Sequence, residues 1–309
     1  MDEKPFAGIK TFLKQPIYTP DKDDGGIGIV GAPFDLGTSN RPGARFGPDA
    51  IRRASAMLCE GDDPHYKLNP VEVLDIWDCG DIDTSVDIAA CVEEIELDIH
   101  TWGLEFDQLV TLGGDHTITL PILRALHAKH GPVRLVHFDA HCDTWVGDGN
   151  YGHGSPFYYA INEGLIIPEE STQIGIRSAI DSEHYKFAED AGMQIFTARD
   201  VHEMGPSEIA HRTTKKGHWT PTYLTFDIDS IDPSQAPGTG TPEVGGIFTW
   251  QALAILDDIN TSLDWVGMDV VEVAPAYDVS EITSLTAATI IWHYLCILSQ
   301  RKLEDKKNG

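Results

Sequence analysis

Eight short apolar runs, rich in β-branched and aromatic residues, recur along the 309-residue chain, and stretches typical of helices separate most of them. The predicted strands span residues 27–30, 71–76, 109–112, 133–138, 173–176, 194–196, 223–226 and 265–271. The predicted helices span residues 48–57, 88–102, 120–129, 182–191, 207–215, 249–260 and 282–299, and several open with Pro, Ser, Thr or Asp as a cap. Strands that alternate with helices in this way form a mainly parallel sheet covered on both faces, so we expect an α/β fold.

No break in composition divides the chain, and 41% hydrophobic residues over this length can build one large core. We therefore expect a single domain over residues 26–309. Residues 1–25 are expected to form an irregular N-terminal arm, because Pro16, Pro20 and the charged run at 21–24 disfavour a regular element.

The acidic charge balance limits the partners of the protein. There are 49 Asp and Glu against 22 Lys and Arg, which gives a formal net charge of -27. Nucleic acid and anionic membranes both attract basic patches, so neither is an expected partner. The charge also favours a cationic ligand, although a solvated acidic surface that serves solubility or salt tolerance is the simpler explanation.

The cysteines and the N-terminus indicate a cytoplasmic protein. The five cysteines are scattered and form no C-x-x-C pair, which favours a reducing compartment over a disulfide framework. The N-terminus lacks a basic start followed by an apolar run, and no stretch reaches about 18 apolar residues. We therefore expect neither a signal peptide nor a membrane span.

Two predicted strands lead directly into acidic motifs. The first is followed by Asp139-x-His141-x-Asp143 and the second by Asp227-x-Asp229. Alternate residues of an extended strand point to one face, so each motif would present its side chains together. Ligand sites in open α/β sheets lie beyond the carboxyl ends of strands, where we expect the two motifs to meet. Buried carboxylates crowd together at low cost only around cations.

Two further strands end in candidate functional residues, His116 in Gly113-Gly114-Asp115-His116 and Glu272. The glycines permit a tight turn that would place His116 over the sheet edge, although a turn with a hydrogen-bonded histidine is the alternative. Oxygen and imidazole donors in this number suit two divalent ions such as Mn, Ni, Zn or Fe(II). The sequence therefore predicts a two-metal hydrolase.

The charge expected around this site indicates the substrate. No Lys or Arg occurs in segments 111–120, 137–163, 223–248 and 266–283. A phosphate or carboxylate would require such residues, whereas a planar cation such as a guanidinium would not. His153 lies on the loop after the first acidic motif and is the candidate for a proton shuttle or a substrate contact. The alternative is a loop histidine without a catalytic role.

Four motifs resemble those of the ureohydrolase family of arginases and agmatinases, and most closely those of bacterial agmatinases. They are Gly113-Gly-Asp-His116 and the segments 137–143, 226–242 and 267–278. Further similarity begins at Gly31-Ala-Pro-Phe-Asp35 and continues to the last helix, so the resemblance covers nearly the whole chain.

The resemblance implies an arginase-like, three-layer α/β/α fold and a binuclear manganese centre. One ion would be held by His116, Asp139, Asp143 and Asp227, and the other by Asp139, His141, Asp227 and Asp229, with Asp139 and Asp227 as bridges. The resemblance further implies that Glu272 binds a guanidinium, that His153 moves protons, and that Thr241 lines the pocket. The same donors accept Ni²⁺. Family members commonly form trimers or hexamers, so a homotrimer or homohexamer is expected.

The expected activity is cleavage of a guanidino substrate to urea and an amine, most closely agmatine to putrescine, a reaction of polyamine metabolism. Alternatives are guanidine, 4-guanidinobutyrate and 3-guanidinopropionate, and the two acids would need a partner such as Arg41, Arg45 or Arg177. Arginine is disfavoured as a substrate because Trp145 stands where arginases carry a polar residue. The Trp145 side chain could offer a cation–π face to an amine, form a hydrophobic wall of the pocket, or only pack within its loop. A non-catalytic metal-binding paralogue is the alternative of another class.

Overall fold

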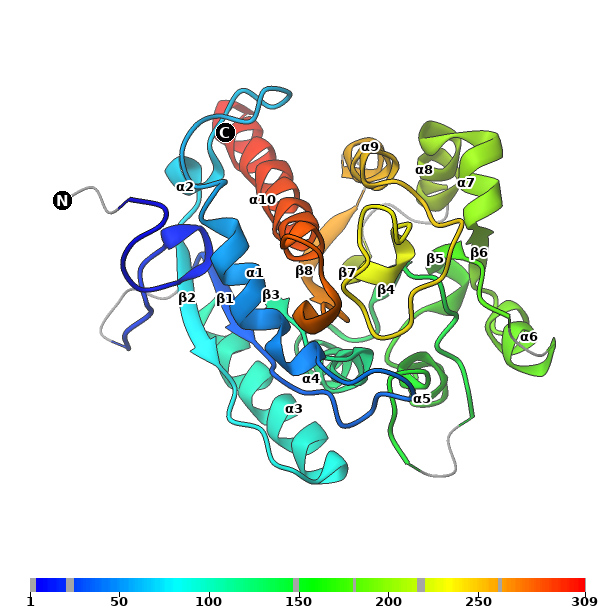
Figure 1. Ribbon diagram of the computed structural model, residues 1–309. Coiled ribbons are helices and arrows are strands. Elements are labelled where there is room, and N and C mark those ends of the chain that lie inside the picture. The colour runs from blue at the N-terminus through cyan, green and yellow to red at the C-terminus, as the bar shows by residue number, and fades with distance from the viewer. Residues whose placement is uncertain are drawn as a thin grey trace.

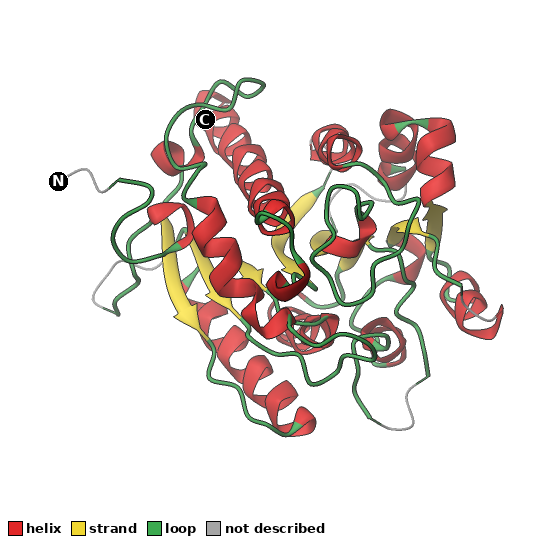
Figure 2. Cartoon of the chain, viewed as in Figure 1, coloured by secondary structure: helices red, strands yellow, loops and turns green. Residues whose placement is uncertain are grey.

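The computed structural model describes residues 4–20, 25–146, 150–179, 182–215, 220–260 and 263–308. Within them, eight strands form one sheet in the order β2-β1-β3-β8-β7-β4-β5-β6, and every neighbouring pair is parallel (Figure 1 and Figure 2). The strands are β1 (Ile27–Gly31), β2 (Ile76–Asp81), β3 (Gln108–Leu112), β4 (Arg134–Phe138), β5 (Thr172–Ile176), β6 (Gln194–Thr197), β7 (Pro221–Asp227) and β8 (Asp264–Val271). The helices are α1 (Gly47–Ser55), α2 (Pro70–Val73), α3 (Ile88–Glu105), α4 (Thr119–His130), α5 (Pro156–Asn162), α6 (Ser182–Asp190), α7 (Ala198–Met204), α8 (Pro206–Thr214), α9 (Thr249–Asn260) and α10 (Ile282–Asn308).

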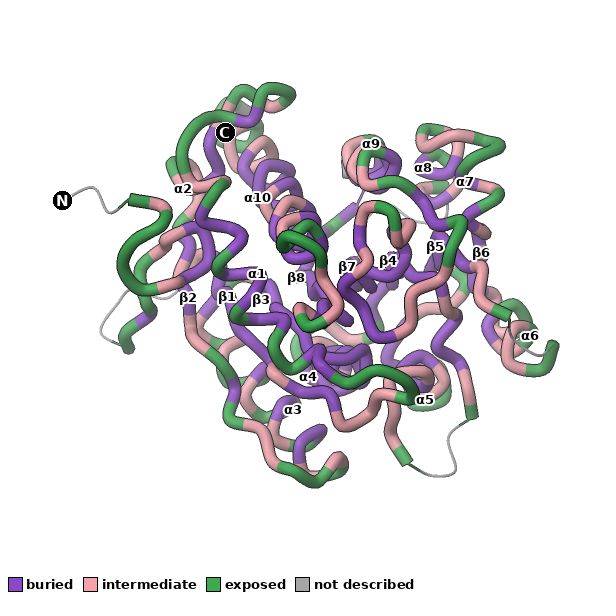
Figure 3. Tube along the Cα trace, viewed as in Figure 1, coloured by how far each residue is buried: buried purple, intermediate pink, exposed green. Residues whose placement is uncertain are grey.

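Helices cover both faces of this sheet, which confirms the predicted three-layer α/β/α fold. Helices α1, α7, α8, α9 and α10 contribute to one hydrophobic core, and α3, α4, α5 and α6 contribute to the other (Figure 1). Alternate strand residues point into the two cores, as Val136 and Leu135 of β4 do. The central strands are buried along most of their length (Figure 3), as expected for a parallel sheet between helix layers.

The strand predicted at residues 71–76 was wrong. This segment begins as helix α2, and strand β2 starts only at Ile76. The side chain of Asn69 accepts a hydrogen bond from the backbone N–H of Val71, and Pro70 occupies the first helical turn. These helix-start features outweigh the β-branched composition of the segment.

Helices α5 and α7 were not predicted, and α10 continues beyond the expected end at residue 299. Helices α5 and α7 are only seven residues long. Helix α7 begins with a capping box in which Thr197 and Asp200 exchange hydrogen bonds directly after β6, so strand and helix signals overlap there.

The described part of the predicted N-terminal arm packs against the sheet. Phe12 and Leu13 are fully buried in one of the two hydrophobic cores. The backbone N–H of Phe12 donates to Asp78, and that of Leu13 donates to the hydroxyl of Ser55. Residues 1–3 and 21–24 of the arm lie outside the described residues.

Helix α10 is long and apolar enough to cross a membrane by length and composition alone, in contrast to the sequence expectation. However, 78% of the 18-residue apolar stretch of this helix is buried within the fold. Its side chains, among them Ile290 and Leu295, belong to a hydrophobic core. The apolar composition is therefore explained by packing against the sheet.

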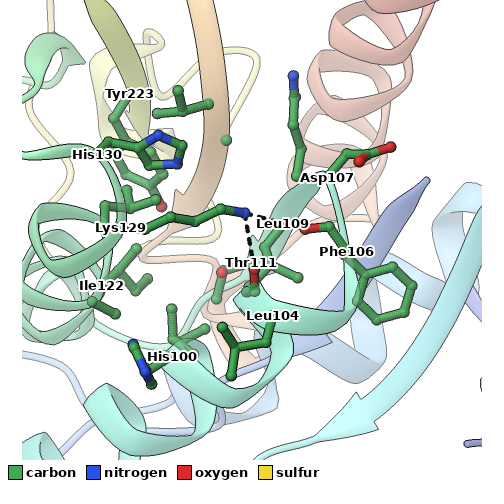
Figure 4. A pocket seen from close by; sticks show the side chains of 17 residues that line it. His100, Leu104, Phe106, Asp107, Leu109, Thr111, Ile122, Lys129, His130 and Tyr223 are labelled. Atoms are coloured by element: carbon green, nitrogen blue, oxygen red, sulfur yellow. Dashed lines mark hydrogen bonds between the residues drawn. The ribbon is translucent and has the colours of Figure 1, made fainter. Parts of the chain in front are cut away.

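A small cavity lies between α3 and α4 at the amino ends of strands β3 and β8 (Figure 4). Its volume is about 40 Å³. The Lys129 side chain extends along it and donates to the carbonyl oxygens of Gly103 and Phe106, at 2.9 and 3.4 Å. The cavity is too small for a metabolite and lies at the opposite end of these strands from the acidic motifs.

Candidate metal centre and active site

Four neighbouring strands end at the candidate site. β3, β8, β7 and β4 are adjacent in this order, so their carboxyl ends bring together residues that are distant in sequence (Figure 1). The turn after β3 requires Gly114, because a Cβ atom there would collide with the backbone of Phe34. His116 follows in a short 3-10 turn, His116–Ile118, which is capped by the Asp115 carboxylate.

Three predicted carboxylates surround one nitrogen of His116. Its Nδ1 atom lies 2.9 Å from Asp143 Oδ2, 3.1 Å from Asp139 Oδ2 and 3.3 Å from Asp227 Oδ2. All four side chains are almost fully buried. The structure therefore brings together the residues that the family resemblance assigns to the first ion.

The hydrogen bonds behind His116 place a proton on its Nε2 atom. Asp269 accepts hydroxyl bonds from Thr119, Tyr223 and Thr225, so the Thr225 proton is directed to that carboxylate. Thr225 Oγ1, 2.9 Å from His116 Nε2, then accepts the ring proton on Nε2. Burial opposes a second proton on Nδ1, but Asp139, Asp143 and Asp227 raise the pKa of His116 well above its usual range. The nitrogen and the three carboxylates face one another around a single point, where a divalent cation would take the place of that proton.

A second cluster shares one carboxylate with the first. His141 Nδ1 lies 3.2 Å from Asp139 Oδ1 and 3.1 Å from Asp229 Oδ2. Thr241 donates its hydroxyl to Asp229 Oδ2 at 3.2 Å. Asp139, His141 and Asp229 lie close enough together to hold an ion, as do His116, His137, Asp139 and Asp143, and Asp139 belongs to both groups.

The acidic motifs do not converge through extended strands, as the sequence interpretation assumed. Strand β4 ends at Phe138, and Asp143 reaches the cluster with a positive φ of 52°. Asp227 is the last residue of β7, and Asp229 follows within a 3-10 turn. Turns rather than strand alternation therefore aim these side chains, because the cluster lies beyond the sheet edge.

Glu272 connects the cluster to His153. Its Oε1 atom accepts the backbone N–H of His116 at 3.0 Å and contacts His153 Nδ1 at 2.9 Å. Its Oε2 atom is buried and has no hydrogen-bond partner among the described residues. Glu272 adopts a positive φ of 65° directly after β8, a costly conformation for a side chain of this size.

His153 is neutral in the arrangement shown by the structure. The backbone N–H of Ser39 donates to its Nε2 atom at 3.0 Å, so the ring proton lies on Nδ1 and points to Glu272. Burial opposes protonation, but Glu272 raises the pKa of His153 to about 9. A second proton on the imidazole would therefore compete with the Ser39 N–H for Nε2.

A pocket with a volume of about 380 Å³ opens beside the clusters. The predicted residues Trp145, Thr241 and His153 line it together with Asp143 and Asp227, whereas the buried Glu272 lies behind His153. None of its thirteen described lining residues is Lys or Arg. Trp145 is held by a backbone hydrogen bond to Gly154. This pocket can admit a small cationic molecule.

The carboxylates at the site favour any positive charge placed between them. Burial, together with Asp229 and Asp139, raises the pKa of Asp227 well above its usual range. Burial and Asp139 also raise the pKa of Asp143. Divalent cations stabilise the ionised forms of such groups and displace their protons.

Two supporting roles were missed in the sequence, that of His137 and that of Arg177, which was considered only as a partner for a substrate carboxylate. His137 belongs to the first acidic motif, but it was not given a role, and its Nε2 atom lies 2.7 Å from Asp139 Oδ2. Arg177 is partly buried, and its guanidinium donates to the backbone carbonyls of Gly175, Asp229, Ser230 and Glu243. His137 follows the strand alternation and was detectable, whereas no local pattern marks Arg177.

Comparisons with known proteins agree with this geometry. The model of the arginase family matches residues 25–296. An agmatinase of Edwardsiella ictaluri is 43% identical over 94% of each chain, and a guanidinopropionase of Pseudomonas aeruginosa is 38% identical over 96% of this chain and 93% of its own. A solved structure described as a hypothetical agmatinase from Burkholderia thailandensis is 41% identical, with a TM-score of 0.90 over 97% of this chain and 93% of its own.

The family, the fold and the acidic clusters lead to one conclusion about the class of enzyme. The chain is a hydrolase that acts on C–N bonds of guanidino compounds, and it most resembles bacterial agmatinases. It belongs to the arginase family.

Proposed function

We propose that the protein hydrolyses agmatine to putrescine and urea at a binuclear manganese centre, with nickel as the alternative metal. The observation that carries this proposal is a pair of buried acceptor clusters beside a pocket whose described lining lacks basic side chains. The proposed ligands are His116, Asp139, Asp143 and Asp227 for one ion, and Asp139, His141, Asp227 and Asp229 for the other.

When bound, two divalent ions supply a water of lowered pKa and polarise the group under attack. The surrounding residues orient the substrate and move protons. Glu272 Oε2, which has no other partner among the described residues, is proposed to accept guanidinium N–H groups. His153 is proposed to deliver a proton to the departing amine, because Glu272 favours its protonated form. Trp145 and Thr241 are proposed to contact the substrate from the pocket wall.

The three arginines that could bind a substrate carboxylate are engaged elsewhere. Arg45 forms an ion pair with Asp35, and Arg41 lies over the Tyr277 ring, 5.3 Å from its centroid. Arg177 is committed to backbone carbonyls. None of the three is among the described residues that line the pocket. This arrangement favours an amine-ended substrate such as agmatine over guanidino acids.

We also propose a homotrimer or homohexamer and a cytoplasmic location, with residues 1–25 as an arm attached to a single domain over residues 26–309. The location is supported by the five cysteines, all of which are free thiols. Size-exclusion chromatography with light scattering, applied to the metal-loaded protein, would measure the oligomeric state.

The direct test of the function measures urea release from agmatine, 4-guanidinobutyrate, 3-guanidinopropionate, guanidine and arginine. The protein is stripped with a chelator and reloaded with Mn²⁺ or Ni²⁺, and metal analysis of protein purified without chelators identifies the native ions. We expect the highest kcat/KM with agmatine. Preference for 3-guanidinopropionate would shift the proposal toward the guanidinopropionase relative. Bound metal without urea from any substrate would support the non-catalytic paralogue.

Two matched variants test the proposed ligands. Asp229→Asn should reduce metal binding and abolish urea release, because Asp229 faces His141. Asp232→Asn makes the same chemical change three residues later, where the carboxylate accepts backbone N–H groups of Ser234, Gly245 and Gly246. It should leave the metal content intact. Equal metal loss in both variants would contradict the ligand assignment.

A further inference from the structure

His137 lies directly beneath the carboxylate shared by the two clusters. It is fully buried on β4, with its ring 4.3 Å from the ring centroid of Phe157 and 5.2 Å from that of His116. Its Nε2 atom lies 2.7 Å from Asp139 Oδ2. Packing against these two rings helps to hold the imidazole in this orientation.

Gln173, on the neighbouring strand β5, determines which nitrogen of His137 carries the proton. Its Nε2 atom donates to the carbonyl oxygen of Cys142 at 2.7 Å and contacts His137 Nδ1 at 3.1 Å. The opposite orientation of this amide would place two oxygens against each other at Cys142. The amide therefore donates to His137 Nδ1, and the imidazole proton must lie on Nε2, where it points to Asp139.

The shared carboxylate is thereby fixed at both oxygens. Asp139 Oδ1 accepts the backbone N–H of His141 at 2.6 Å and faces the second cluster. Asp139 Oδ2 accepts from His137 and faces His116 in the first cluster. Each oxygen thus keeps lone-pair capacity for a different ion, and the two donors prevent the carboxylate from rotating.

We propose that His137 and Gln173 are positioning residues that hold Asp139 as the bridge between the two ions. This inference rests on the binuclear centre proposed above. His137 Nε2 lies close enough to His116, Asp139 and Asp143 to be mistaken for a ligand. Its proton excludes that role, because a metal ion binds the unprotonated nitrogen of a neutral imidazole. Gln173 also ties strand β5 to the loop that carries His141 and Asp143.

Substitutions at position 137 distinguish a positioning residue from a metal ligand. The amide nitrogen of glutamine can occupy the place of Nε2, so His137→Gln keeps the donor to Asp139. Asparagine reaches only the place of Nδ1, so His137→Asn and His137→Leu both lose the donor. Gln173→Leu should also weaken metal binding, because the imidazole proton of His137 is then no longer held on Nε2 and the loop at Cys142 loses its hydrogen bond. His293→Leu is the control, because it removes another buried histidine bonded to a carboxylate, Asp257, at 2.8 Å.

The main readout is Mn²⁺ binding to the stripped full-length protein, measured by competition with a fluorescent chelator, and it requires no activity. We expect a loss of about 10–100-fold in affinity for the Asn, Leu and Gln173→Leu variants. His137→Gln should retain most of the affinity and two ions per subunit, and His293→Leu should change only the thermal midpoint. At saturating Mn²⁺, electron paramagnetic resonance should show a coupled pair in His137→Gln and a perturbed coupling in His137→Leu.

Two results would overturn the proposal. Loss of one ion per subunit in His137→Gln would identify His137 as a ligand. Unchanged affinity and unchanged coupling in His137→Leu would show that Asp139 needs no support from this side. Failure of the proposed agmatine reaction would leave both metal readouts intact, so the two proposals can be tested separately.

Discussion

Thr225 links a proposed metal ligand to a buried carboxylate, and the substitution Thr225→Val tests that link. Its hydroxyl oxygen accepts from His116 Nε2 at 2.9 Å and donates to Asp269 at 2.6 Å. Valine has nearly the same shape but can form neither bond. Thr119→Val is the matched control, since the Thr119 hydroxyl donates to the same carboxylate, at 2.9 Å.

The expected magnitudes follow from these bonds. Each variant removes one hydrogen bond to a fully buried carboxylate, which contributes about 1.5–3 kcal/mol. Only Thr225→Val also leaves the buried Nε2–H of His116 without an acceptor, at a further cost of about 1–3 kcal/mol. The free energy of unfolding should therefore fall by about 1–3 kcal/mol more in Thr225→Val than in Thr119→Val. Mn²⁺ affinity should fall by about 10–100-fold in Thr225→Val alone, because the orientation of His116 is no longer fixed.

Two measurements check this expectation. Denaturant titration of the stripped protein gives the unfolding free energies, and competition with a fluorescent chelator gives the Mn²⁺ affinities. Equal affinity losses in both variants would refute the reasoning, since they would show that the carboxylate acts independently of His116. An unchanged affinity in Thr225→Val would refute it as well.

Three further predictions follow from buried charges. Asp78→Ala should lower the free energy of unfolding by about 3–5 kcal/mol in denaturant titration. The buried Arg52 guanidinium loses bonds of 2.9 and 3.0 Å and keeps only the more exposed Asp81 as a charged partner among the described residues, and the buried N–H of Phe12 loses its acceptor. A loss below about 1 kcal/mol would contradict this. The kcat/KM of the metal-loaded enzyme should fall as pH rises through about 9. Burial opposes protonation of His153, but Glu272 raises the pKa of His153 to about 9, and the protonated form that acts as the acid is lost above that value. A flat profile to pH 10 would exclude this role. Mn²⁺ affinity should rise with pH and Mn²⁺ binding should release protons, because burial and the nearby Asp229 raise the pKa of Asp227. Calorimetry in two buffers of different ionisation enthalpy measures the number of protons released. The absence of proton release would contradict this prediction.

The sequence was sufficient to predict the fold class and the meeting of the acidic motifs at one edge of the sheet. Seven of the eight predicted strands match strands of the structure, since hydrophobic periodicity is a local property that a single sequence carries. The acidic motifs follow β4 and β7, and parallel strands bring their carboxyl ends to one edge. The segment at 71–76 was wrong because Asn69 and Pro70 start a helix where β-branched residues favour a strand.

Tertiary structure decided how the proposed ligands are held. Strand order places β8, with Glu272 at its end, between β3 and β7, and local sequence does not specify that order. The proton on His137 is set by Gln173 from β5, and that on His116 by Thr225 from β7. These assignments depend on contacts between strands separated by many residues. The sequence by itself determined which chemical groups reach the sheet edge, whereas packing determined which atom of each group faces a cation, because hydrogen-bond direction depends on tenths of an ångström between distant segments.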